Sequence, residues 1–453
     1  MKIKHTEIEI NTENPFANCK LDRKQYASIL SDIVNTYADG FVLAINNEWG
    51  TGKTTFVKMW QQDLKNNGFK TIYFNAWEND FNKNPLVALM SELQMLTKEN
   101  NKLFKSVIEK GAVLAKNVLP ALLKSVVKTM TGIDSDIIEN IAKGTTEIFE
   151  KEINEYTTKK KTVLEFKKDL EKFIKEISTD KPLVFIIDEL DRCRPDYAVE
   201  VLEQVKHFFS VSGVVFVLSI DKNHLASSIK GYYGSESINT NEYLRRFIDL
   251  EYSIPKPFTR QFCNYLFDFY SFDDFYSNND DSYYLLTMSV LLFDKSNATL
   301  RQQEKIFALT RLILSSFDSN KGTFSHLLFV LIYTKVFYSQ LYEKIKNKVY
   351  SLQELCDFFE NLVSLENNEY GKNLVYVEAL LLHFYNNNKG HNREKLVERD
   401  SNGNTICLIK SKFKNVFEKD NYLKNCLNKV EEYTLNLNYF LDKIDLTQPI
   451  NKI

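Results

Sequence analysis

The feature that most constrains the fold of this chain is the segment EWGTGKTTF (Glu48–Phe56), which follows the apolar run Phe41–Ile45. An apolar run that leads through a glycine-containing turn into a helical pattern is typical of a strand, a phosphate-binding loop and a helix. In such a loop the backbone N–H groups of Gly50 to Thr54 surround phosphate oxygens. The helix that starts near Lys53 adds the positive end of its dipole. The segment therefore predicts an α/β fold with a phosphate site.

Two side chains of this loop suit a nucleotide that is bound with Mg²⁺. Lys53 can place its ammonium against the β and γ phosphates, and the Thr54 hydroxyl can ligate Mg²⁺. Asn47 stands where the strict pattern has a glycine, five residues before Gly52. Asn tolerates a positive φ better than most residues, so the turn remains compatible with the loop. The predicted nucleotide-binding residues are Asn47, Glu48, Trp49, Gly50, Thr51, Gly52, Lys53, Thr54 and Thr55.

The overall composition is that of a globular protein with two or three domains. The chain has 453 residues, of which 44% are hydrophobic and 26% charged, and its formal net charge is −2. This charge gives no direct indication of nucleic-acid binding. The six cysteines are far apart and include no CxxC pair, which favours reduced thiols over zinc ligands. The N-terminal residues lack the apolar run of a secretory signal. These features favour a cytoplasmic location.

Five mostly apolar segments alternate with helical patterns before Pro257. The segments expected to be strands are residues 41–45, 70–77, 183–188, 214–221 and 249–254. Apolar strands that alternate with helices indicate a parallel sheet covered on both faces. By its place in this alternation, the segment 214–221 should lie beside the phosphate-loop strand. We therefore expect an α/β P-loop core with a five-stranded parallel sheet, formed by residues 1–97 and 179–257.

The connection between the second and third of these segments is long enough to hold a helical insertion, residues 98–178. Its most apolar part, Gly111–Met130, contains Lys116, Lys124 and Lys128. These lysines fall within about one third of a helical wheel. Each would cost roughly 2.5–3.5 kcal/mol near the centre of a bilayer, which disfavours a membrane span. Two interpretations remain: a helix packed on its own domain, or a helix that docks on a membrane surface or a partner.

After Pro257 the strand patterns fade, and Leu, Phe and Tyr recur at helical spacing. Residues 258–453 are therefore predicted to form a helical C-terminal region. Within it, the polar segment Asn386–Asn404 is expected to be a loop, followed by a helical tail over roughly residues 412–442. No motif in this region indicates a second chemistry.

Two adjacent acids close the third apolar segment, PLVFIIDELDRC. Asp188 is expected at the carboxyl end of a buried strand, where an acid can hold the water shell of Mg²⁺ facing Thr54. Glu189 follows directly, where a carboxylate can polarise an attacking water. The alternative is that both acids cap the next turn and are solvated. Such an acid pair suits the P-loop proteins that hydrolyse their nucleotide.

Other polar residues fall near expected strand ends. Asp221 either reaches the γ-phosphate or its water, or caps the helix that begins near Lys222, and the two roles are compatible. In FNAWEND, Asn75 and Glu78 are expected at the carboxyl edge of the sheet, where ligands bind in open α/β folds. Trp77 is expected to be a core anchor rather than a ligand.

Several arginines are candidates for contact with a γ-phosphate. Arg192 follows Asp191, and a local salt bridge is favoured over contact with the nucleotide of a neighbouring subunit. Arg246, with Arg245 beside it, could supply transition-state charge as an arginine finger, and a solvated surface position is the alternative. Arg301 opens a helix in the C-terminal region, where it could act as a sensor on domain closure.

Six segments, taken in order, resemble the KAP family of P-loop NTPases: EWGTGKTTF, FNAWEND, FIIDELDRCRPD, VLEQVKHFF, VVFVLSIDKNHL and EYLRRFIDLEYSIPKP. The resemblance covers roughly residues 14–310. It implies that the nucleotide loop, or Walker A motif, is Gly50, Gly52, Lys53 and Thr54. It also implies that Asp188, beside Glu189, is the Walker B acid, and that the LDR signature is Leu190, Asp191 and Arg192.

The resemblance carries two further expectations. Many members of the family have transmembrane helices between the two Walker motifs, where this chain has a charged insertion, so the chain resembles the soluble branch. Bacterial members include phage-exclusion proteins, which gives antiviral defence as an expected role.

We therefore predict an ATPase that binds ATP and Mg²⁺ and whose cycle drives a conformational change or assembly with a protein partner or a second copy. The alternative is a nucleotide-gated switch or adaptor with little turnover. A kinase is disfavoured because the chain shows no acceptor pocket or lid motif. The predicted metal ligands are Thr54 and Asp188, and the predicted catalytic residues are Lys53, Asp188, Glu189, Asp221 and Arg246.

Overall fold

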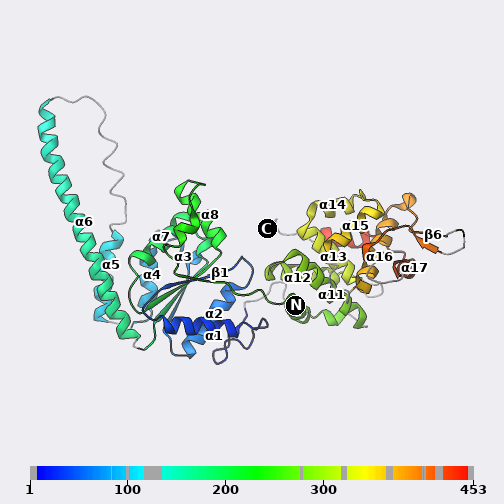
Figure 1. Cartoon of the computed structure of the whole chain (residues 1–453), viewed down its shortest axis with the longest axis horizontal. Coiled ribbons are helices and arrows are strands. Elements are labelled where there is room, and N and C mark those ends of the chain that lie inside the picture. The colour runs from blue at the N-terminus through cyan, green and yellow to red at the C-terminus, as the bar shows by residue number, and fades with distance from the viewer. Residues whose placement is uncertain are drawn as a thin grey trace. The chain divides into compact units, whose positions relative to one another are not determined.

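The computed structural model of the chain contains two compact units, which we call the sheet unit (Ile8–Pro255) and the helical unit (Lys256–Ile453) (Figure 1). A parallel β-sheet organises the first unit, and the second consists mainly of helices. The structure describes residues 8–82, 84–97, 101–116, 135–178, 180–275, 279–317, 324–363, 371–399, 401, 405–413 and 422–446.

The sheet unit is built on five strands in the order β2-β3-β4-β1-β5, and every pairing between them is parallel. The predicted neighbour of the phosphate-loop strand is confirmed, because Ala44 of β1 lies opposite Leu218 of β4. The predicted α/β P-loop fold with a five-stranded parallel sheet is likewise confirmed. The strands are β1 (Val42–Asn46), β2 (Thr71–Asn75), β3 (Leu183–Asp188), β4 (Val214–Ile220) and β5 (Leu250–Tyr252).

Helices cover both faces of this sheet, as continuous apolar strands require. Along β3, Val184 and Ile186 pack into the cluster formed with α1 and α2, whereas Phe185 and Ile187 pack into the cluster on the opposite face. The strand is therefore buried on both sides, and its last residue lies at the carboxyl edge of the sheet. The helices are α1 (Lys24–Thr36), α2 (Lys53–Asn66), α3 (Ala76–Asn79), α4 (Pro85–Gln94), α7 (Pro195–His207), α8 (Lys222–Tyr233) and α9 (Thr240–Leu244), with the 3₁₀ turn η2 (Leu190–Arg192).

The predicted insertion between the two Walker motifs is helical and consists of α5 (Lys102–Lys116) and α6 (Ser135–Ile177). The two helices pack through Phe104 and Phe173, whose ring centroids lie 5.0 Å apart. Of the segment 111–130, only the first six residues, at the end of α5, fall within the described part of the chain. Among the helices that the structure describes, none has the length and apolar character needed to cross a bilayer.

The helical unit confirms the predicted helical character of the C-terminal region. Its most buried helix is α13, in which every residue from Ser325 to Thr334 is buried. Several of the other helices contact it, and the rest pack against those. The elements are α10 (Thr259–Phe269), η3 (Phe272–Phe275), α11 (Asn279–Ser296), α12 (Leu300–Leu314), α13 (Ser325–Phe337), α14 (Ser339–Lys346), α15 (Leu352–Leu362), α16 (Gly371–Asn388), η5 (Gly390–Asn392), α17 (Tyr422–Val430) and α18 (Asn438–Leu446).

The expectation of a simple loop over Asn386–Asn404 is wrong. This segment contains the end of α16, the turn η5 and a short strand, β6 (Val397–Arg399), which pairs in antiparallel fashion with β7 (Thr405–Cys407). The sequence pattern does not predict this pairing because three-residue strands have too few side chains to show an alternating pattern. Such strands are defined by their backbone hydrogen bonds alone.

Candidate functional site

The loop between β1 and α2 takes the conformation that its glycines allow. Gly50 and Gly52 both have φ of 79°, in the left-handed region that side chains with a Cβ rarely occupy. Gly52 is also the N-cap residue of α2, so Lys53 and Thr54 stand in the first turn of that helix. The loop therefore ends at a helix N-terminus, where backbone N–H groups and the helix dipole favour an anion.

Asn47 serves this loop in a different way from the one expected. It is not among the described residues with positive φ. Its side chain instead pairs with the backbone of Ile254: Nδ2 donates to the carbonyl oxygen at 2.8 Å, and Oδ1 accepts from the N–H at 2.9 Å. The Asn47 N–H donates to the carbonyl oxygen of Ile220 at 3.2 Å. The start of the loop is thus fixed to the ends of two neighbouring strands.

Lys53 is directed at its own loop. It is 8% exposed, and its Nζ donates to the carbonyl oxygens of Asn47 and, at 3.2 Å, Glu48. Burial lowers the pKa of Lys53, while the carboxylates of Asp191, Asp221 and Asp188 act in the opposite direction. The ammonium is therefore surrounded by groups of negative charge or partial charge.

Asp188 is the last residue of β3 and is only 1% exposed. Its Oδ2 accepts a hydrogen bond from the Tyr73 hydroxyl at 2.9 Å, and its Oδ1 accepts from the Glu189 N–H at 3.0 Å. Burial, followed by the charge of Asp188, raises the pKa of Tyr73, so the phenol stays protonated and donates. The carboxylate is held in one orientation and is not a solvated cap.

Glu189 has strained backbone geometry. Its φ of 61° lies in the left-handed region, which costs a non-glycine residue about 1–3 kcal/mol and is often found at functional sites. Its carboxylate pairs with Arg192 at 2.7 Å and accepts a hydrogen bond from Asn75 Nδ2 at 3.3 Å. Burial raises the pKa of Glu189, and the Arg192 charge opposes this shift. The favoured local salt bridge of Arg192 is therefore present.

The segment after β2 differs from the expected strand over residues 70–77. β2 ends at Asn75, whose side chain accepts hydrogen bonds from the N–H groups of Trp77 at 3.1 Å and Glu78 at 3.2 Å and so caps α3. Trp77 thus lies on a helix rather than in the sheet. It is 52% exposed, and the expectation of a core anchor is wrong. Its ring centroid lies 5.6 Å from the guanidinium carbon of Arg192.

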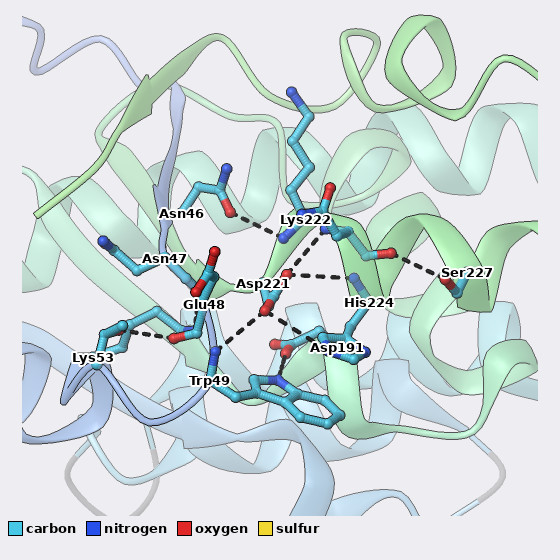
Figure 2. A network of polar contacts seen from close by, with 12 residues as sticks. Asn46, Asn47, Glu48, Trp49, Lys53, Asp191, Asp221, Lys222, His224 and Ser227 are labelled. Carbon is cyan, nitrogen blue, oxygen red and sulfur yellow. Dashed lines mark hydrogen bonds and ion pairs between the residues drawn. The ribbon is translucent and has the colours of Figure 1, made fainter. Parts of the chain in front are cut away.

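A network of polar contacts joins the loop to the end of β4 (Figure 2). Asp221 caps α8, as predicted, by accepting from the N–H groups of Asn223 and His224 at 3.1 and 3.4 Å. Its other oxygen accepts from the Trp49 N–H at 3.2 Å. The Trp49 indole donates to Asp191 and stacks on the His224 ring, with centroids 3.6 Å apart and planes inclined by 2°. The loop is therefore clamped from β4 and from η2.

Among the described residues, none of the contacts of this network is made by the remaining candidate arginines. Arg245 is exposed and pairs with Glu242 at 3.2 Å. Arg246 is also exposed, and within the described part of the chain it makes no hydrogen bond or ion pair to the loop. Arg301 stands at the start of α12 in the helical unit. Their proposed roles as finger or sensor stay predictions.

Sequence reasoning missed Arg23, which precedes α1. Its side chain is 5% exposed, and it donates from Nη1 to the carbonyl oxygen of Gly52 at 3.1 Å and from Nη2 to that of Thr51 at 2.8 Å. In the sequence it was one of many charged residues beside an amphipathic helix, and nothing in the pattern connected it with a loop that lies almost thirty residues away.

A parallel sheet with a glycine loop after β1 and an acid at the end of β3 defines a P-loop NTPase domain. A model of the KAP family P-loop domain matches residues 23–315, which is more than half of the chain. The chain belongs to the KAP family of P-loop domains. Comparison with curated proteins finds no match.

Among solved structures, the chain is similar at low identity to the following three proteins. The ORC2 protein of Aeropyrum pernix, in ADPNP–ADP complexes, shows 14% identity and a TM-score of 0.33, with 90% of this chain and 94% of that chain covered. A DNA replication initiation factor shows 12% identity and a TM-score of 0.32, with 97% of this chain and 95% of that chain covered. The replication initiator DnaA bound to AMPPCP and single-stranded DNA shows 11% identity and a TM-score of 0.28, with 96% of this chain and 95% of that chain covered.

Proposed function

We propose that this protein is an Mg²⁺-dependent ATPase whose nucleotide lies at the carboxyl edge of the five-stranded sheet. One observation carries the proposal: the glycine loop with Lys53 and the acids that close β3 belong to the same edge of one parallel sheet. In P-loop proteins this arrangement places a cation, a helix N-terminus and carboxylates around a triphosphate.

The phosphates would be held by the loop. The N–H groups from Gly50 to Thr54 would donate to phosphate oxygens, and the Lys53 ammonium would exchange the carbonyls of Asn47 and Glu48 for the β and γ phosphates. Phosphate oxygens carry full negative charge, and charge-assisted hydrogen bonds are roughly twice as strong as neutral ones. The exchange therefore favours the bound nucleotide.

The donor set at the end of β3 fits Mg²⁺. Asp188 offers a buried carboxylate whose orientation is fixed by Tyr73, and Thr54 offers a hydroxyl from the first turn of α2. Oxygen ligands of this kind are those that Mg²⁺ prefers. When bound, the ion would neutralise charge on the β and γ phosphates.

Glu189 is the proposed group that orients and polarises the attacking water. To do so, its carboxylate must be ionised and must face the γ-phosphate. Burial raises the pKa of Glu189 and so favours the neutral form, whereas the Arg192 charge and the Asn75 hydrogen bond act in the opposite direction. The salt bridge and the Asn75 contact also fix the side chain. Asp221, at the end of β4, supports the loop through Trp49 and is the second acid proposed to lie near the water.

The proposal is tested by measuring Mg²⁺-dependent ATP turnover and ATP binding in the wild type, Lys53→Ala and Glu189→Gln. We expect Lys53→Ala to lose ATP binding. Glu189→Gln should keep it while turnover falls about 10²–10³-fold, as when a single group that stabilises a transition state is removed. Lys65→Ala, at an exposed position of α2, and Glu236→Gln, at an exposed position after α8, are matched controls. Equal rates in wild type and both site variants would sink the proposal.

One observation favours the alternative of a nucleotide-gated switch with little turnover. Glu189 Oε1 pairs with Arg192 and Oε2 accepts a hydrogen bond from Asn75 Nδ2, so the carboxylate is held by protein partners and offers a water only its remaining lone pairs. Single-turnover rates, together with sizing of the protein with and without ATP, separate the two functions. A slow single turnover with an ATP-dependent change in assembly supports the switch, and fast turnover supports the ATPase.

The process that the nucleotide serves is proposed from the family resemblance to be antiviral defence, through a protein partner or a second copy of the chain. Cells that carry the wild type or Lys53→Ala, challenged with phage, test this role. Equal plaque formation in the two strains contradicts it.

A further inference from the structure

We infer that Arg23 is a positioning residue that orients the phosphate loop from the side opposite the nucleotide. This inference rests on the proposed function, since it concerns how the same loop is prepared for a phosphate. The guanidinium is buried, and its two terminal nitrogens donate to adjacent carbonyls, those of Thr51 at 2.8 Å and Gly52 at 3.1 Å. These two carbonyls belong to the central peptides of the loop.

The geometry of the peptide bond gives this contact its consequence. In a trans peptide the C=O and the following N–H point in opposite directions. When Arg23 holds the Thr51 carbonyl, the N–H of Gly52 is aimed the other way. When it holds the Gly52 carbonyl, the N–H of Lys53 is aimed the other way as well. Both N–H groups are among those that surround phosphate in a loop of this kind.

The loop needs such a constraint because its glycines do not supply one. Gly50 and Gly52 populate many backbone conformations in the absence of other forces, and fixing them carries a larger entropy cost than fixing other residues. The planar fork of an arginine presents its donors in a fixed geometry that suits two neighbouring acceptors. The Gly52 carbonyl also accepts from the Phe56 N–H at 3.1 Å, so the guanidinium and the first turn of α2 share it.

Arg23 can act in this way because its helix is fixed to α2. The Trp60 indole of α2 donates to the Ser31 hydroxyl of α1 at 2.9 Å. Phe16, which precedes α1, contacts Phe56 of α2, with ring centroids 6.3 Å apart. The backbone that carries the Arg23 side chain is thus fixed relative to α2, the helix that follows the loop.

The electrostatics of Arg23 point to an anionic ligand. Burial lowers its pKa. Its Nε is buried without a hydrogen-bond partner, and among the ion pairs of the described residues none involves Arg23. A buried cation whose partners are neutral carbonyls pays a desolvation cost that no carboxylate offsets. A phosphate group bound on the other side of the same two peptides would offset part of that cost, through the polarised N–H groups.

The test compares Arg23→Gln and Arg23→Lys with Lys24→Gln, an exposed position that follows on the same helix and loses the same charge. ATP affinity is measured by titration, KM and kcat are measured separately, and melting temperature is recorded without nucleotide. We expect Arg23→Gln to raise the Kd for ATP and the KM about tenfold or more, because charge-assisted hydrogen bonds to the loop are lost. The kcat at saturating ATP should stay within about threefold. The Kd and KM of Arg23→Lys should lie between those of the wild type and Arg23→Gln, and the Kd and KM of Lys24→Gln should match those of the wild type.

The Kd, KM and melting temperature of these variants together decide whether Arg23 positions the loop. A lowered melting temperature in Arg23→Gln with an unchanged Kd and KM overturns the inference, because it reveals a purely structural role. If Arg23→Gln does not fold, Arg23→Lys decides, since it keeps the charge and loses the fork: a wild-type Kd overturns the inference and a raised Kd supports it. Wild type and Lys53→Ala are titrated in parallel. If the wild type fails to bind ATP, the proposed function fails. If it binds and Arg23→Gln binds equally well, only the role of Arg23 fails.

Discussion

Acidic side chains are buried in both units of this protein, at the carboxyl edge of the sheet and between α15 and α16 of the helical unit, but their surroundings differ. At the sheet edge, Asp188, Glu189 and Asp191 are contacted by side chains from the loop, from β2 and from η2, and the neighbouring Trp49 is 38% exposed. In the helical unit, Glu360 and Glu378 are almost completely buried. Asp188 and Asp191 are themselves buried, so the first group reaches solvent only at Glu189, whose side chain is 14% exposed, and the second group is enclosed throughout.

The enclosed group has its partners within its own unit, and Glu360 Oε2 is the one carboxylate oxygen there that has an ion pair without a hydrogen bond. Glu378 accepts from the Cys356 thiol at 3.2 Å and from the Ser411 hydroxyl at 2.8 Å. Glu360 is contacted by the backbone N–H of Lys412 and, at 3.2 Å, by its ammonium. Ligand atoms of Cys356, Glu360 and Glu378 lie within 4.8 Å of one another, a spacing known from metal sites, yet each carboxylate has a donor from the protein. We therefore interpret this cluster as structural.

The comparison shows that the kind of residue does not decide its role. A carboxylate that ends a strand at an open sheet edge can exchange its partners for a ligand, whereas one enclosed between helices must be satisfied when the unit folds. Substitutions at the sheet edge should therefore affect activity more than stability, and substitutions in the enclosed cluster should do the reverse.

The largest effect is expected for Asp188→Ala. Loss of the proposed metal-holding carboxylate should lower Mg²⁺-dependent ATP turnover by about 10²-fold or more, because charge on the phosphates is then less well stabilised. Melting temperature should change little by comparison. Asp196→Ala, an exposed acid in the first turn of α7, is the control. Turnover within a few-fold of the wild type would show that Asp188 has no part in the reaction.

Glu378→Ala should lower stability and leave ATP binding nearly unchanged, which is the opposite of the pattern expected for Asp188→Ala. It leaves the Cys356 thiol and the Ser411 hydroxyl without their acceptor and creates a cavity, for a loss of roughly 2–4 kcal/mol in the free energy of unfolding of the helical unit. Chemical denaturation of the full chain measures this loss, with Glu398→Ala at an exposed position of β6 as the control. ATP affinity of the folded protein should stay within about twofold. A stable variant with altered ATP affinity would reverse the assignment of the two clusters.

The enclosed cluster also predicts a pH dependence. Burial raises the pKa of Glu378 to about 8, above its ordinary value of 4.5. Between these values the folded state binds a proton that the unfolded state has lost, so stability falls as pH rises, by at most about 1.4 kcal/mol per pH unit. The contribution is complete below pH 4.5 and is lost by pH 8. Denaturation midpoints at pH 6 and pH 8 measure it, and Glu378→Gln should abolish this slope. An equal slope in the two proteins contradicts the raised pKa.

A smaller effect is expected for Asn47→Gly, which restores the residue of the strict loop pattern. Because the Asn47 side chain makes two hydrogen bonds to the backbone of Ile254, its removal should lower stability by about 1–2 kcal/mol and weaken ATP binding a few-fold. Thermal unfolding and ATP titration measure the two changes, and Asn67→Gly, at the end of α2, is a reference for loss of an exposed Asn. A variant as stable as the wild type, or more so, would show that the bonds between Asn47 and Ile254 do not stabilise the start of the loop.

Much of the fold could be predicted because its signals are local. Four of the five strands are apolar runs in the sequence, and the loop between Gly50 and Thr54 has a characteristic spacing of glycines, Lys and Thr. Capping by Asp221 was likewise predictable, since a cap lies within three residues of its partners. Trp77 was misjudged because a large apolar ring suggests burial, while a cap only two residues away turned the chain into an exposed helix.

The contacts that complete the candidate site join residues far apart in the sequence. Asn47 and Ile254 are 207 residues apart, Trp49 and Asp191 are 142 apart, and Arg23 lies 28 and 29 residues before the carbonyls that it holds. No spacing in one sequence can indicate such pairs. The first two pairs arise because parallel strands bring their carboxyl ends to one edge, and the Arg23 contacts arise because α1 packs against α2. Both arrangements set neighbours in space without regard to order in the chain.

The sequence by itself determined the class of this protein. A glycine loop after an apolar strand, with Lys53 and a later strand closed by Asp188, has few other folds available, because backbone N–H groups and hydrophobic runs specify it locally. Only the tertiary structure decided which side chains hold that loop in shape. Arg23 behind it, Asn47 at its start and the Trp49–Asp191 contact beside it depend on the packing of helices and strands, and packing is a property of the whole core rather than of any segment.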